Sequence, residues 1–348
     1  MKESKKKVIF AMSGGVDSSV AAWLLQSRGF EVKGIFLKLS NSDFSKESFE
    51  KAKKISKILK IPISAVDARK EFKKKVIGYF LKESKRGITP NPCVVCNEEI
   101  KFGILLKKAL EMGADFLATG HYVKKTESVV GLKTVYKLSI AKDKKKDQSY
   151  FLWRLNQRKL KHVLFPLGEY MKKEVTEMAK TLGIMKLIRG ESRDICFIKN
   201  TTGEFLTSHL SEKLGKIVNT KRKIIGEHRG LWLYTIGQRK GIKLSGGPYY
   251  VLNKDFKSNT LTVTKNGKNL FGKELLCSDL NWISGKEPKF PLKAEAKIRY
   301  RHRLSPAVSS FSKEGLKIIF EKSQRAITAG QSIVFYKNEE LLGGGVIC

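Results

Sequence analysis

The segment Ser13-Gly14-Gly15-Val16-Asp17-Ser18-Ser19 constrains this chain most, because it lies between an apolar run typical of a strand, residues 8–12, and one typical of a helix, residues 20–25. Two adjacent glycines let the backbone approach an anion closely, and a following helix directs unpaired N–H groups and its positive dipole end toward that anion. The serines add hydroxyl donors, whereas Asp17 does not favour a bare phosphate and therefore indicates a magnesium ion. The segment predicts a nucleotide-phosphate site.

This loop differs from the P-loop of kinases and GTPases, because no Lys-Ser or Lys-Thr pair follows the glycines. It resembles the pyrophosphatase loop of enzymes that split ATP into AMP and pyrophosphate and so activate a substrate oxygen as an adenylate. An ordinary strand-to-helix connection is the alternative. The strand, the glycines, the acid and the helix nevertheless occur in the order that a phosphate site requires.

The size, charge and cysteine content restrict the class of protein. At 348 residues the chain exceeds the size at which one hydrophobic core keeps growing, so we expect two or three domains. No apolar run approaches the length of a membrane span, and we expect a soluble, cytoplasmic protein without a secretory signal. A net charge of +36 predicts nucleic acid as partner, with a lysine-biased composition as the alternative. Five unevenly spaced cysteines do not form a secreted disulfide framework.

Strand-like and helix-like patterns alternate up to about residue 200, which predicts an α/β fold with a Rossmann-like parallel sheet. Ligands bind beyond the carboxyl ends of such strands, so the loop should share a rim with residues 119–122. Residues 123–143 are typical of a hairpin, which we expect to be a solvent-facing insertion. We assign residues 1–203 to an ATP-binding catalytic domain, 204–274 to a small central α+β domain and 275–348 to a C-terminal β-barrel.

Two cysteines lie in the segment Thr-Pro-Asn-Pro-Cys-Val-Val-Cys-Asn, residues 89–97, where two Xaa-Pro pairs favour extended backbone just before a helix. Asn97 is the expected cap of that helix. The helix dipole and Lys101, one turn further on, should then stabilise the thiolate of Cys96. Cys96 is the expected nucleophile.

Cys196 is the expected second reactive thiol, because Arg189 and Arg193 precede it and favour its thiolate. Zinc would want four ligands, and three cysteines are at hand. Three thiols would suit an iron–sulfur cluster with one open iron, whereas a redox or sulfur-relay pair needs two. For Cys277 and Cys348 we expect a buried small hydrophobe and a chain-end thiol.

An ATP-splitting loop, a thiol pair and a polycationic body together indicate RNA thiolation. Over essentially its whole length the chain resembles the tRNA-uridine 2-sulfurtransferases, also called tRNA-specific 2-thiouridylases. The matching segments are AMSGGVDSS, TPNPCVVCNEEIKFG, ATGHY, KDQSYFL, DICFI, GEHRGLWLYTIGQRKGI, KIRYRH and AGQSIVFY, in that order. The resemblance implies ATP-dependent replacement of the C2 oxygen of the wobble uridine of certain tRNAs by sulfur.

The resemblance also implies roles for individual residues. The C2 oxygen would attack the α-phosphate of ATP and release pyrophosphate, so that AMP becomes the leaving group. Cys196 would receive a persulfide from a cysteine desulfurase or sulfur-relay protein, and Cys96 would release its sulfur through a transient Cys96–Cys196 disulfide. The implied ATP-binding positions are Ala11, Met12, Ser13, Gly14, Gly15, Val16, Asp17, Ser18, Leu37 and Gly120. The implied tRNA-contacting positions are Asn91, Pro92, Cys93, His121, Lys146, Asp147, Gln148, Arg299, Tyr300 and Gln331.

One position departs from the family pattern, because some members carry aspartate where this chain has Cys93. Either the thiol substitutes in redox chemistry, or Cys93, Cys96 and Cys196 bind a cluster whose open iron delivers sulfide; we rank the persulfide route first. Two rival functions use part of the same evidence. A small-molecule synthetase needs neither paired thiols nor excess positive charge, and a non-catalytic RNA-binding or cluster-binding protein needs no intact loop.

Overall fold

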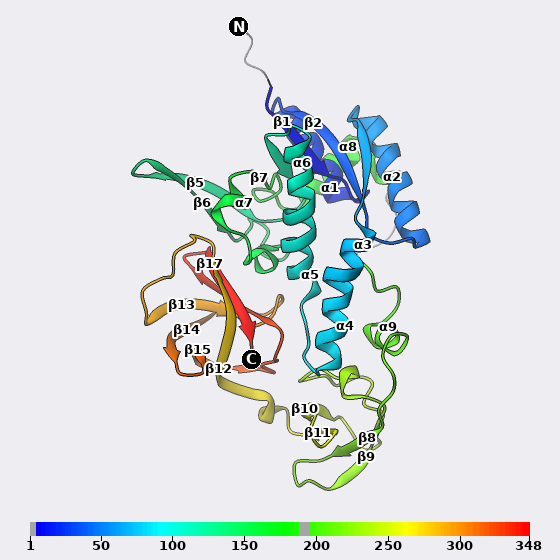
Figure 1. The fold of residues 1–348 in the computed structure, drawn as a ribbon, viewed down its shortest axis with the longest axis vertical. Coiled ribbons are helices and arrows are strands. Elements are labelled where there is room, and N and C mark those ends of the chain that lie inside the picture. The colour runs from blue at the N-terminus through cyan, green and yellow to red at the C-terminus, as the bar shows by residue number, and fades with distance from the viewer. Residues whose placement is uncertain (1–4, 188–194) are drawn as a thin grey trace.

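The computed structural model describes residues 5–187 and 195–348. Its first sheet has the strand order β3-β2-β1-β4-β7, and the neighbouring strands are parallel throughout. The strands are β1 (Lys7–Ala11), β2 (Glu31–Lys38), β3 (Ile63–Asp67), β4 (Phe116–Ala118) and β7 (Val163–Leu164). The Rossmann-like parallel sheet predicted from the alternating pattern is confirmed (Figure 1).

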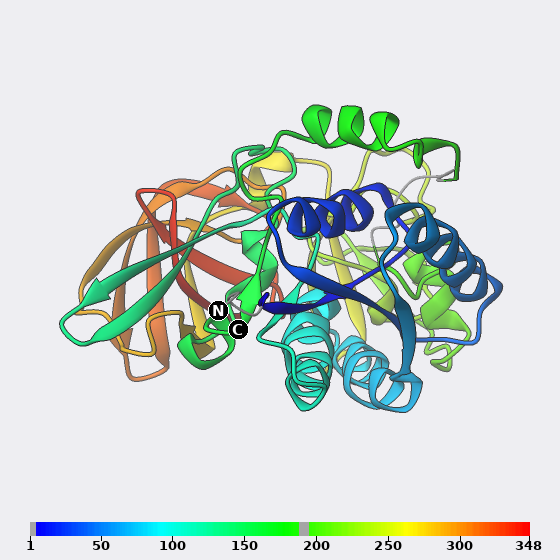
Figure 2. The ribbon, with the colours of Figure 1, turned by 90° about the horizontal axis from the view of Figure 1, so that it is seen from above.

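Helices cover both faces of this sheet, because successive side chains of a strand point to opposite sides. Val8 and Phe10 of β1 pack with α1 (Val16–Ser27), α2 (Asp43–Leu59) and α8 (Lys172–Thr181). Ile9 faces the other way and packs with residues of η2 (Cys96–Leu105) and α6 (Leu106–Glu111). Figure 2 shows the sheet between these two layers.

The second layer contains two helical stretches that change between α and π geometry. One consists of α3 (Arg69–Phe72), η1 (Lys73–Ile77) and α4 (Gly78–Lys85), and the other of α5 (Pro92–Val95), η2 and α6; η1 and η2 are π-helices. The second stretch begins at Pro92, whose fixed φ and missing N–H suit a first helical position. The expected cap at Asn97 is therefore wrong. Asn97 lies inside η2, where its Nδ2 donates to the carbonyl of Phe151 at 3.1 Å.

The C-terminal strands close into the predicted β-barrel. The order is β12-β15-β14-β13-β16-β17, and a further pairing of β12 with β17 completes the ring. Alternate side chains of these strands fill one apolar core, which includes Ile318, Phe320 and Phe335. The strands are β12 (Phe271–Trp282), β13 (Leu292–Lys297), β14 (Ser305–Ser312), β15 (Gly315–Arg325), β16 (Ser332–Lys337) and β17 (Glu340–Ile347).

The hairpin of β5 (Lys124–Val130) and β6 (Lys133–Ser139) is not the solvent-facing insertion that the sequence predicts. Ser139 and Leu138 of β6 pair with Glu340 and Leu341 of β17, so the base of the hairpin extends the barrel sheet, and Leu138 is fully buried. Its tip projects from the molecule, as Figure 1 shows, and Leu132 there is fully exposed. A period-two pattern indicates a strand but not the strand with which it pairs.

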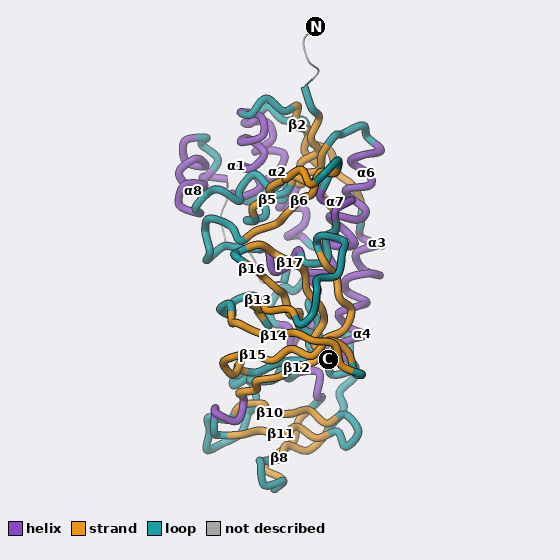
Figure 3. The backbone as a smooth tube through the Cα atoms, turned by 90° about the vertical axis from the view of Figure 1, so that its left-hand side faces the viewer, coloured by secondary structure: helices purple, strands orange, loops and turns teal. Residues whose placement is uncertain are grey.

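A small α+β unit lies at one end of the molecule, beyond the barrel (Figure 3). Its sheet has the order β10-β11-β8-β9 around a core that contains Ile217, Val251 and Leu261. His228 of β9 is buried, and its Nδ1 accepts from the N–H of Gly230 at 3.1 Å. The elements are α9 (Thr202–Thr207), β8 (Gly215–Val218), β9 (Ile224–His228), η5 (Leu231–Leu233), β10 (Tyr250–Asp255), β11 (Thr260–Thr264) and η6 (Gly267–Leu270).

Short elements connect these units, namely η3 (Ser149–Leu152), α7 (Gln157–Leu160) and η4 (Met185–Leu187). Within residues 5–187 and 195–348, no helix combines the length and apolar character needed to cross a membrane.

Candidate active site

The predicted phosphate loop connects β1 to α1 and leaves the first turn of that helix open. Gly14 has φ +80°, and a Cβ there would lie 2.5 Å from a carbonyl oxygen of α2, so only glycine fits. Gly15 is the N-cap of α1 and provides no side chain to bind the free N–H groups. The hydroxyl oxygens of Ser13 and Ser18 lie 3.0 Å apart beside it. The first-turn N–H groups are therefore the donors that the loop leaves open to an anion, whereas the Ser18 hydroxyl donates to the carbonyl of Gly15 at 3.0 Å.

The other expected ATP-binding residues lie along the same edge of the sheet. Strands β1 and β4 are parallel neighbours, so the loop after β1 and Gly120 after β4 meet. A Cβ on Gly120 would lie 3.2 Å from the Cα of Ser18, which shows how closely the two backbones approach. Leu37, near the end of β2, contacts the apolar cluster that contains Cys96. Leu37 thus connects the expected ATP-binding edge of the sheet with the apolar cluster around Cys96.

Tyr122, which the sequence places on the rim of the loop, and Lys172, which the sequence did not single out, hold the acid of the loop. The Oδ1 atom of Asp17 accepts from the hydroxyl of Tyr122 at 2.7 Å and from the Nζ of Lys172 at 2.5 Å. Burial and the charge of Asp17 raise the pKa of Tyr122, which keeps its hydroxyl a donor. Lys172 is the first residue of α8, where a cation opposes the helix dipole. That unfavourable position is the sequence signal that could have identified it.

The segment that carries Cys196 packs against the apolar cluster of Cys96, although 100 residues separate the two cysteines. Cys96 is 7% exposed and belongs to an apolar cluster with Phe72 and Ile100. Phe197, next to Cys196, packs against this cluster and places its ring centroid 5.7 Å from that of Phe72. A charge on Cys196 would act on Cys96 and raise its pKa. Cys196 is an exposed residue, but its sulfur lies among protein atoms that raise its own pKa.

The predicted thiolate character of Cys96 is not present in this structure. Burial raises the pKa of Cys96 to about 12, and the opposing effect of Lys101 is smaller. The helix begins four residues before Cys96, so the thiol lies beyond the free N–H groups of the first turn and inside an apolar cluster. Surrounding protein atoms also raise the pKa of Cys196, again opposed by Lys101. Arg189 and Arg193, invoked for Cys196, lie outside the described residues.

The alternative of a bound cluster needs three thiols that converge on one point. Cys93 is half-buried at the start of the helix, one turn from Cys96, and its charge also acts on that thiol. Among the residues that the structure describes, no group of three His, Cys, Asp or Glu side chains is placed to hold a metal ion. In this arrangement Cys93, Cys96 and Cys196 therefore do not fit a cluster.

Four of the ten expected tRNA-contacting residues are buried. Asn91 and Pro92 lie at the start of the cysteine helix, and His121 is 7% exposed. Asp147 is 3% exposed and holds its own loop together, because its Oδ1 accepts from the backbone N–H of Ala141 at 3.1 Å and its Oδ2 from a serine hydroxyl at 2.8 Å. These four side chains are directed into the protein.

The remaining expected contacts are more accessible. Lys146 is exposed, whereas Gln148 accepts from the backbone N–H of Tyr122 at 3.0 Å. Arg299 donates to two backbone carbonyls that join the barrel to the central unit. Gln331 donates through Nε2 to the carbonyl of Thr89 at 2.9 Å, so the barrel supports the segment that leads into the cysteine helix. The ring of Tyr300 lies 4.5 Å from that of a phenylalanine, centroid to centroid.

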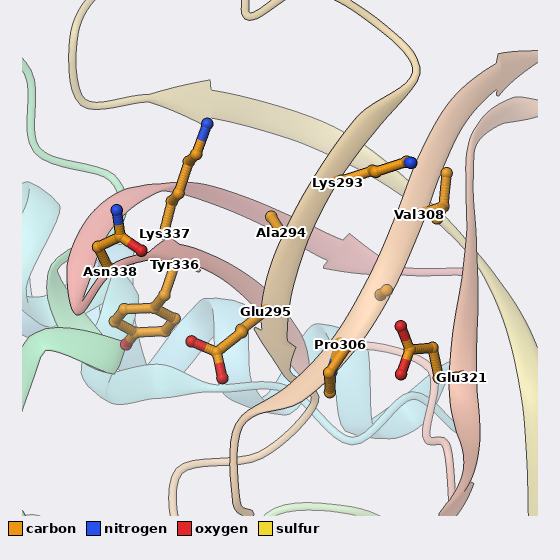
Figure 4. A pocket seen from close by; sticks show the side chains of 10 residues that line it. Lys293, Ala294, Glu295, Pro306, Val308, Glu321, Tyr336, Lys337 and Asn338 are labelled. Atoms are coloured by element: carbon orange, nitrogen blue, oxygen red, sulfur yellow. The ribbon is translucent and has the colours of Figure 1, made fainter.

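A hollow of about 480 Å³ lies on the barrel, between β13, β14 and the turn that joins β16 to β17. Figure 4 shows the side chains that line it, among them Lys293, Glu295, Glu321 and Tyr336. No residue of the phosphate loop and no cysteine lines this hollow. It is separate from the site built here.

Comparisons with known proteins agree with this architecture. Residues 6–200 match the tRNA methyl transferase HUP domain, residues 203–265 the tRNA methyl transferase PRC-barrel domain and residues 272–347 the aminomethyltransferase beta-barrel domain. A tRNA-specific 2-thiouridylase MnmA of Clostridioides difficile is 41% identical over 98% of both chains. The corresponding protein of Syntrophomonas wolfei is 43% identical over 98% of this chain and 99% of its own.

A solved structure is matched more weakly. The U34-tRNA thiolase NcsA from Methanococcus maripaludis is 24% identical over 52% of this chain and 57% of its own, with a TM-score of 0.35, which supports no further inference. The sequence relatives, in contrast, extend over nearly the full length of both chains at more than 40% identity. The chain therefore belongs to the tRNA-specific 2-thiouridylase family.

Proposed function

We propose that this chain catalyses the ATP-dependent 2-thiolation of the wobble uridine of tRNA. The observation that supports the proposal is that Leu37, an expected ATP-binding residue, packs against the apolar cluster that holds Cys96. Residues 1–203 would form the catalytic domain, residues 204–274 the central domain and residues 275–348 the barrel that contacts tRNA. The enzyme would act in the cytoplasm, where thiols stay reduced.

The first step is adenylation of the base. The C2 oxygen of uridine attacks the α-phosphorus of ATP, and pyrophosphate leaves. The N–H groups of the first turn of α1 and the hydroxyls of Ser13 and Ser18 would bind phosphate oxygens, and Lys172 would turn from Asp17 to the phosphates. The carboxylate of Asp17, oriented by Tyr122, suits Mg²⁺, which would neutralise phosphate charge when bound. The ion pair between Asp17 and Lys172 would thus open when ATP binds, with Asp17 then facing Mg²⁺ and Lys172 facing the phosphates.

The second step transfers sulfur. Cys196, whose thiol is exposed, would accept a sulfane atom from a cysteine desulfurase or sulfur-relay protein and become a persulfide. The Cys96 sulfur attacks the inner sulfur of that persulfide and forms the Cys96–Cys196 disulfide. The proton of the Cys96 thiol passes to the departing sulfur, which leaves as hydrosulfide. Hydrosulfide attacks C2 and displaces AMP. The two electrons that reduce the sulfane atom come from the two cysteines, so an external dithiol must reduce the disulfide after each turnover.

The persulfide route is favoured over a cluster, because it needs two thiols and not three. A cluster would need Cys93 as well, in a grouping that the described residues do not form. Binding of tRNA would use the net charge of +36, with exposed cations such as Lys146. Affinity should then fall with salt, with a log-log slope of about −0.7 for each phosphate neutralised on single-stranded segments.

The proposal is tested with α-labelled ATP, a persulfide donor and unmodified tRNA. We expect pyrophosphate release only when tRNA is present, and 2-thiouridine in the digested tRNA by mass spectrometry. Cys196→Ser should abolish both the protein persulfide and the thiolated base, whereas Cys96→Ser should keep the persulfide and lose the product. Cys348→Ser, at an exposed thiol on the barrel, is the matched control and should retain full activity.

Two outcomes would contradict the proposal. Equal pyrophosphate release without RNA would favour a small-molecule synthetase that uses the same loop. Binding of tRNA without any pyrophosphate release would favour a non-catalytic RNA-binding protein. A persulfide on Cys96 rather than Cys196 would exchange the roles of the two cysteines.

A further inference from the structure

We propose that the ammonium group of Lys101, held in place by His121, is a positive charge shared by Cys96 and Cys196, and that the π-helical geometry of η2 places it there. The meaning of this charge for sulfur transfer rests on the proposed function. The presence of this charge beside the thiols does not depend on that function, and thiol alkylation tests it without the thiolation reaction.

The register of η2 places Lys101 on the same face of the helix as Cys96. Cys96 is the first residue of this π-helix, and Lys101 follows five residues later. Backbone bonds in a π-helix span five residues, so residues five apart lie nearly one above the other. In an α-helix the same two side chains would point about 140° apart. The π geometry therefore turns Lys101 toward the face that carries Cys96.

A glycine allows this geometry. A Cβ on Gly103 would lie 2.9 Å from the carbonyl oxygen of Glu98, which is five residues earlier in the same helix. In a π-helix the carbonyl of Glu98 is the one that faces the N–H of Gly103, so a side chain at position 103 would crowd this carbonyl. The helix returns to α geometry at Leu106, after the last residue of η2.

A contact with His121 orients Lys101. The Nζ of Lys101 lies 3.4 Å from the Nε2 of His121, and the Nδ1 of His121 lies 2.8 Å from the hydroxyl of Thr119. Burial and the neighbouring cation hold the pKa of His121 well below its ordinary value, so the ring is neutral. A neutral ring accepts at one nitrogen and donates at the other. His121 therefore accepts from Lys101 and donates to Thr119, at the carboxyl end of β4.

This contact assigns His121 a different role from the tRNA contact that the family resemblance implies. The ring is 7% exposed and packs against Phe102 and Phe165, with centroid distances of 5.8 and 6.1 Å. It is a positioning residue, because it acts through Lys101 and does not itself reach the reacting sulfur atoms. The neutral partner leaves the charge of the ammonium available to the thiols.

The charge of Lys101 acts on both thiols. Lys101 lowers the pKa of Cys96 and of Cys196, in both cases against a larger effect of burial. The other ionisable groups that act on Cys96 are Cys93 and Cys196, and both oppose its ionisation. Among the groups that the structure describes, which do not include Arg189 and Arg193, Lys101 is thus the cation that favours the anionic sulfur species. In the proposed reaction these are the attacking Cys96 thiolate and the departing hydrosulfide, and Lys101 forms no covalent bond in the step.

The test measures thiol reactivity and needs neither ATP nor tRNA nor a sulfur donor. Iodoacetamide alkylation of Cys196 is followed from pH 6 to 10 by mass spectrometry, with Cys348 of the same molecule as the reference thiol. In Lys101→Met we expect the alkylation of Cys196 to slow about tenfold near neutral pH, with its midpoint shifted to higher pH, because one pKa unit changes the thiolate fraction about tenfold. Lys101→Arg keeps the charge and should stay near the wild-type rate.

Three comparisons make the result decisive. Lys107→Met removes an exposed lysine of α6 and should leave Cys196 unaffected, so an equal effect there would overturn the proposal. An unchanged Cys196 rate in Lys101→Met would overturn it as well. If Lys101→Met does not fold, His121→Phe is the second variant, because it keeps Lys101 and an aromatic ring at position 121. It should slow the alkylation of Cys196 by a smaller factor than Lys101→Met. No slowing would refute the role of His121. If the wild-type protein shows the expected alkylation pattern but forms no 2-thiouridine, the proposed function is refuted and the role of Lys101 is not.

Discussion

Replacing Phe197 with alanine should separate the two reactive cysteines without altering either of them. The Phe197 ring lies 5.7 Å from that of Phe72, 5.6 Å from that of Phe80 and 5.2 Å from that of Phe205, centroid to centroid. Such aromatic pairs each contribute about 0.5–1.5 kcal/mol beyond burial, and truncating a fully buried phenylalanine costs about 3–5 kcal/mol. Because Phe197 is only half-buried, we expect a loss of about 2 kcal/mol, or about thirtyfold in the ratio of docked to undocked segment.

Hydrogen exchange measures this ratio directly, because an amide in a locally opening segment exchanges in proportion to the open population. The N–H of Ile198 donates to the carbonyl of Ile195 at 3.1 Å and reports on the segment that carries Cys196. In Phe197→Ala its protection should fall about thirtyfold, whereas barrel amides should be unchanged. Phe311→Ala, at a 52% exposed phenylalanine of β14, is the matched control. Unchanged protection of residues 195–198 would refute the view that Phe197 docks Cys196 beside Cys96.

Three further variants test the loop, its cation and the central unit. Lys172→Met should raise the ATP concentration for half-maximal pyrophosphate release about ten- to hundredfold, because a hydrogen bond to a charged group contributes about 1.5–3 kcal/mol. Lys173→Met, at the exposed neighbour, is the control, and an equal effect there would contradict the role of Lys172. Gly14→Ala should abolish ATP binding in a titration while the circular dichroism spectrum persists, because φ is +80° and a Cβ would lie 2.5 Å from a backbone oxygen; near-normal binding would argue against the loop geometry. Burial lowers the pKa of Lys254 from its ordinary 10.5 to about 8, so between these values the unfolded chain binds more protons and stability rises with pH. Lys254→Met should therefore raise the thermal midpoint at pH 7, by an amount that shrinks between pH 8 and 10.5; a pH-independent difference would contradict the burial effect.

The features that could be predicted from the sequence are those that local order decides. The phosphate loop needs only a strand, two glycines and a helix in succession, and the structure has them as β1, Gly14, Gly15 and α1. The parallel sheet and the barrel follow from side-chain periods within short segments. The sequence places Tyr122 on the rim of the loop, but the hydrogen bonds of Tyr122 and Lys172 to Asp17 join residues 105 and 155 positions apart and depend on the tertiary fold.

The cysteine site shows the boundary between the two kinds of information. Residue type, neighbouring cations and the family resemblance together predict Cys96 and Cys196 as the reactive pair. Whether Cys96 is a thiolate depends instead on the apolar cluster around it, to which Phe72 and Phe197 contribute from distant segments. Tertiary packing therefore decided the ionisation of the nucleophile, because desolvation depends on every neighbouring atom and not on the residues adjacent in sequence.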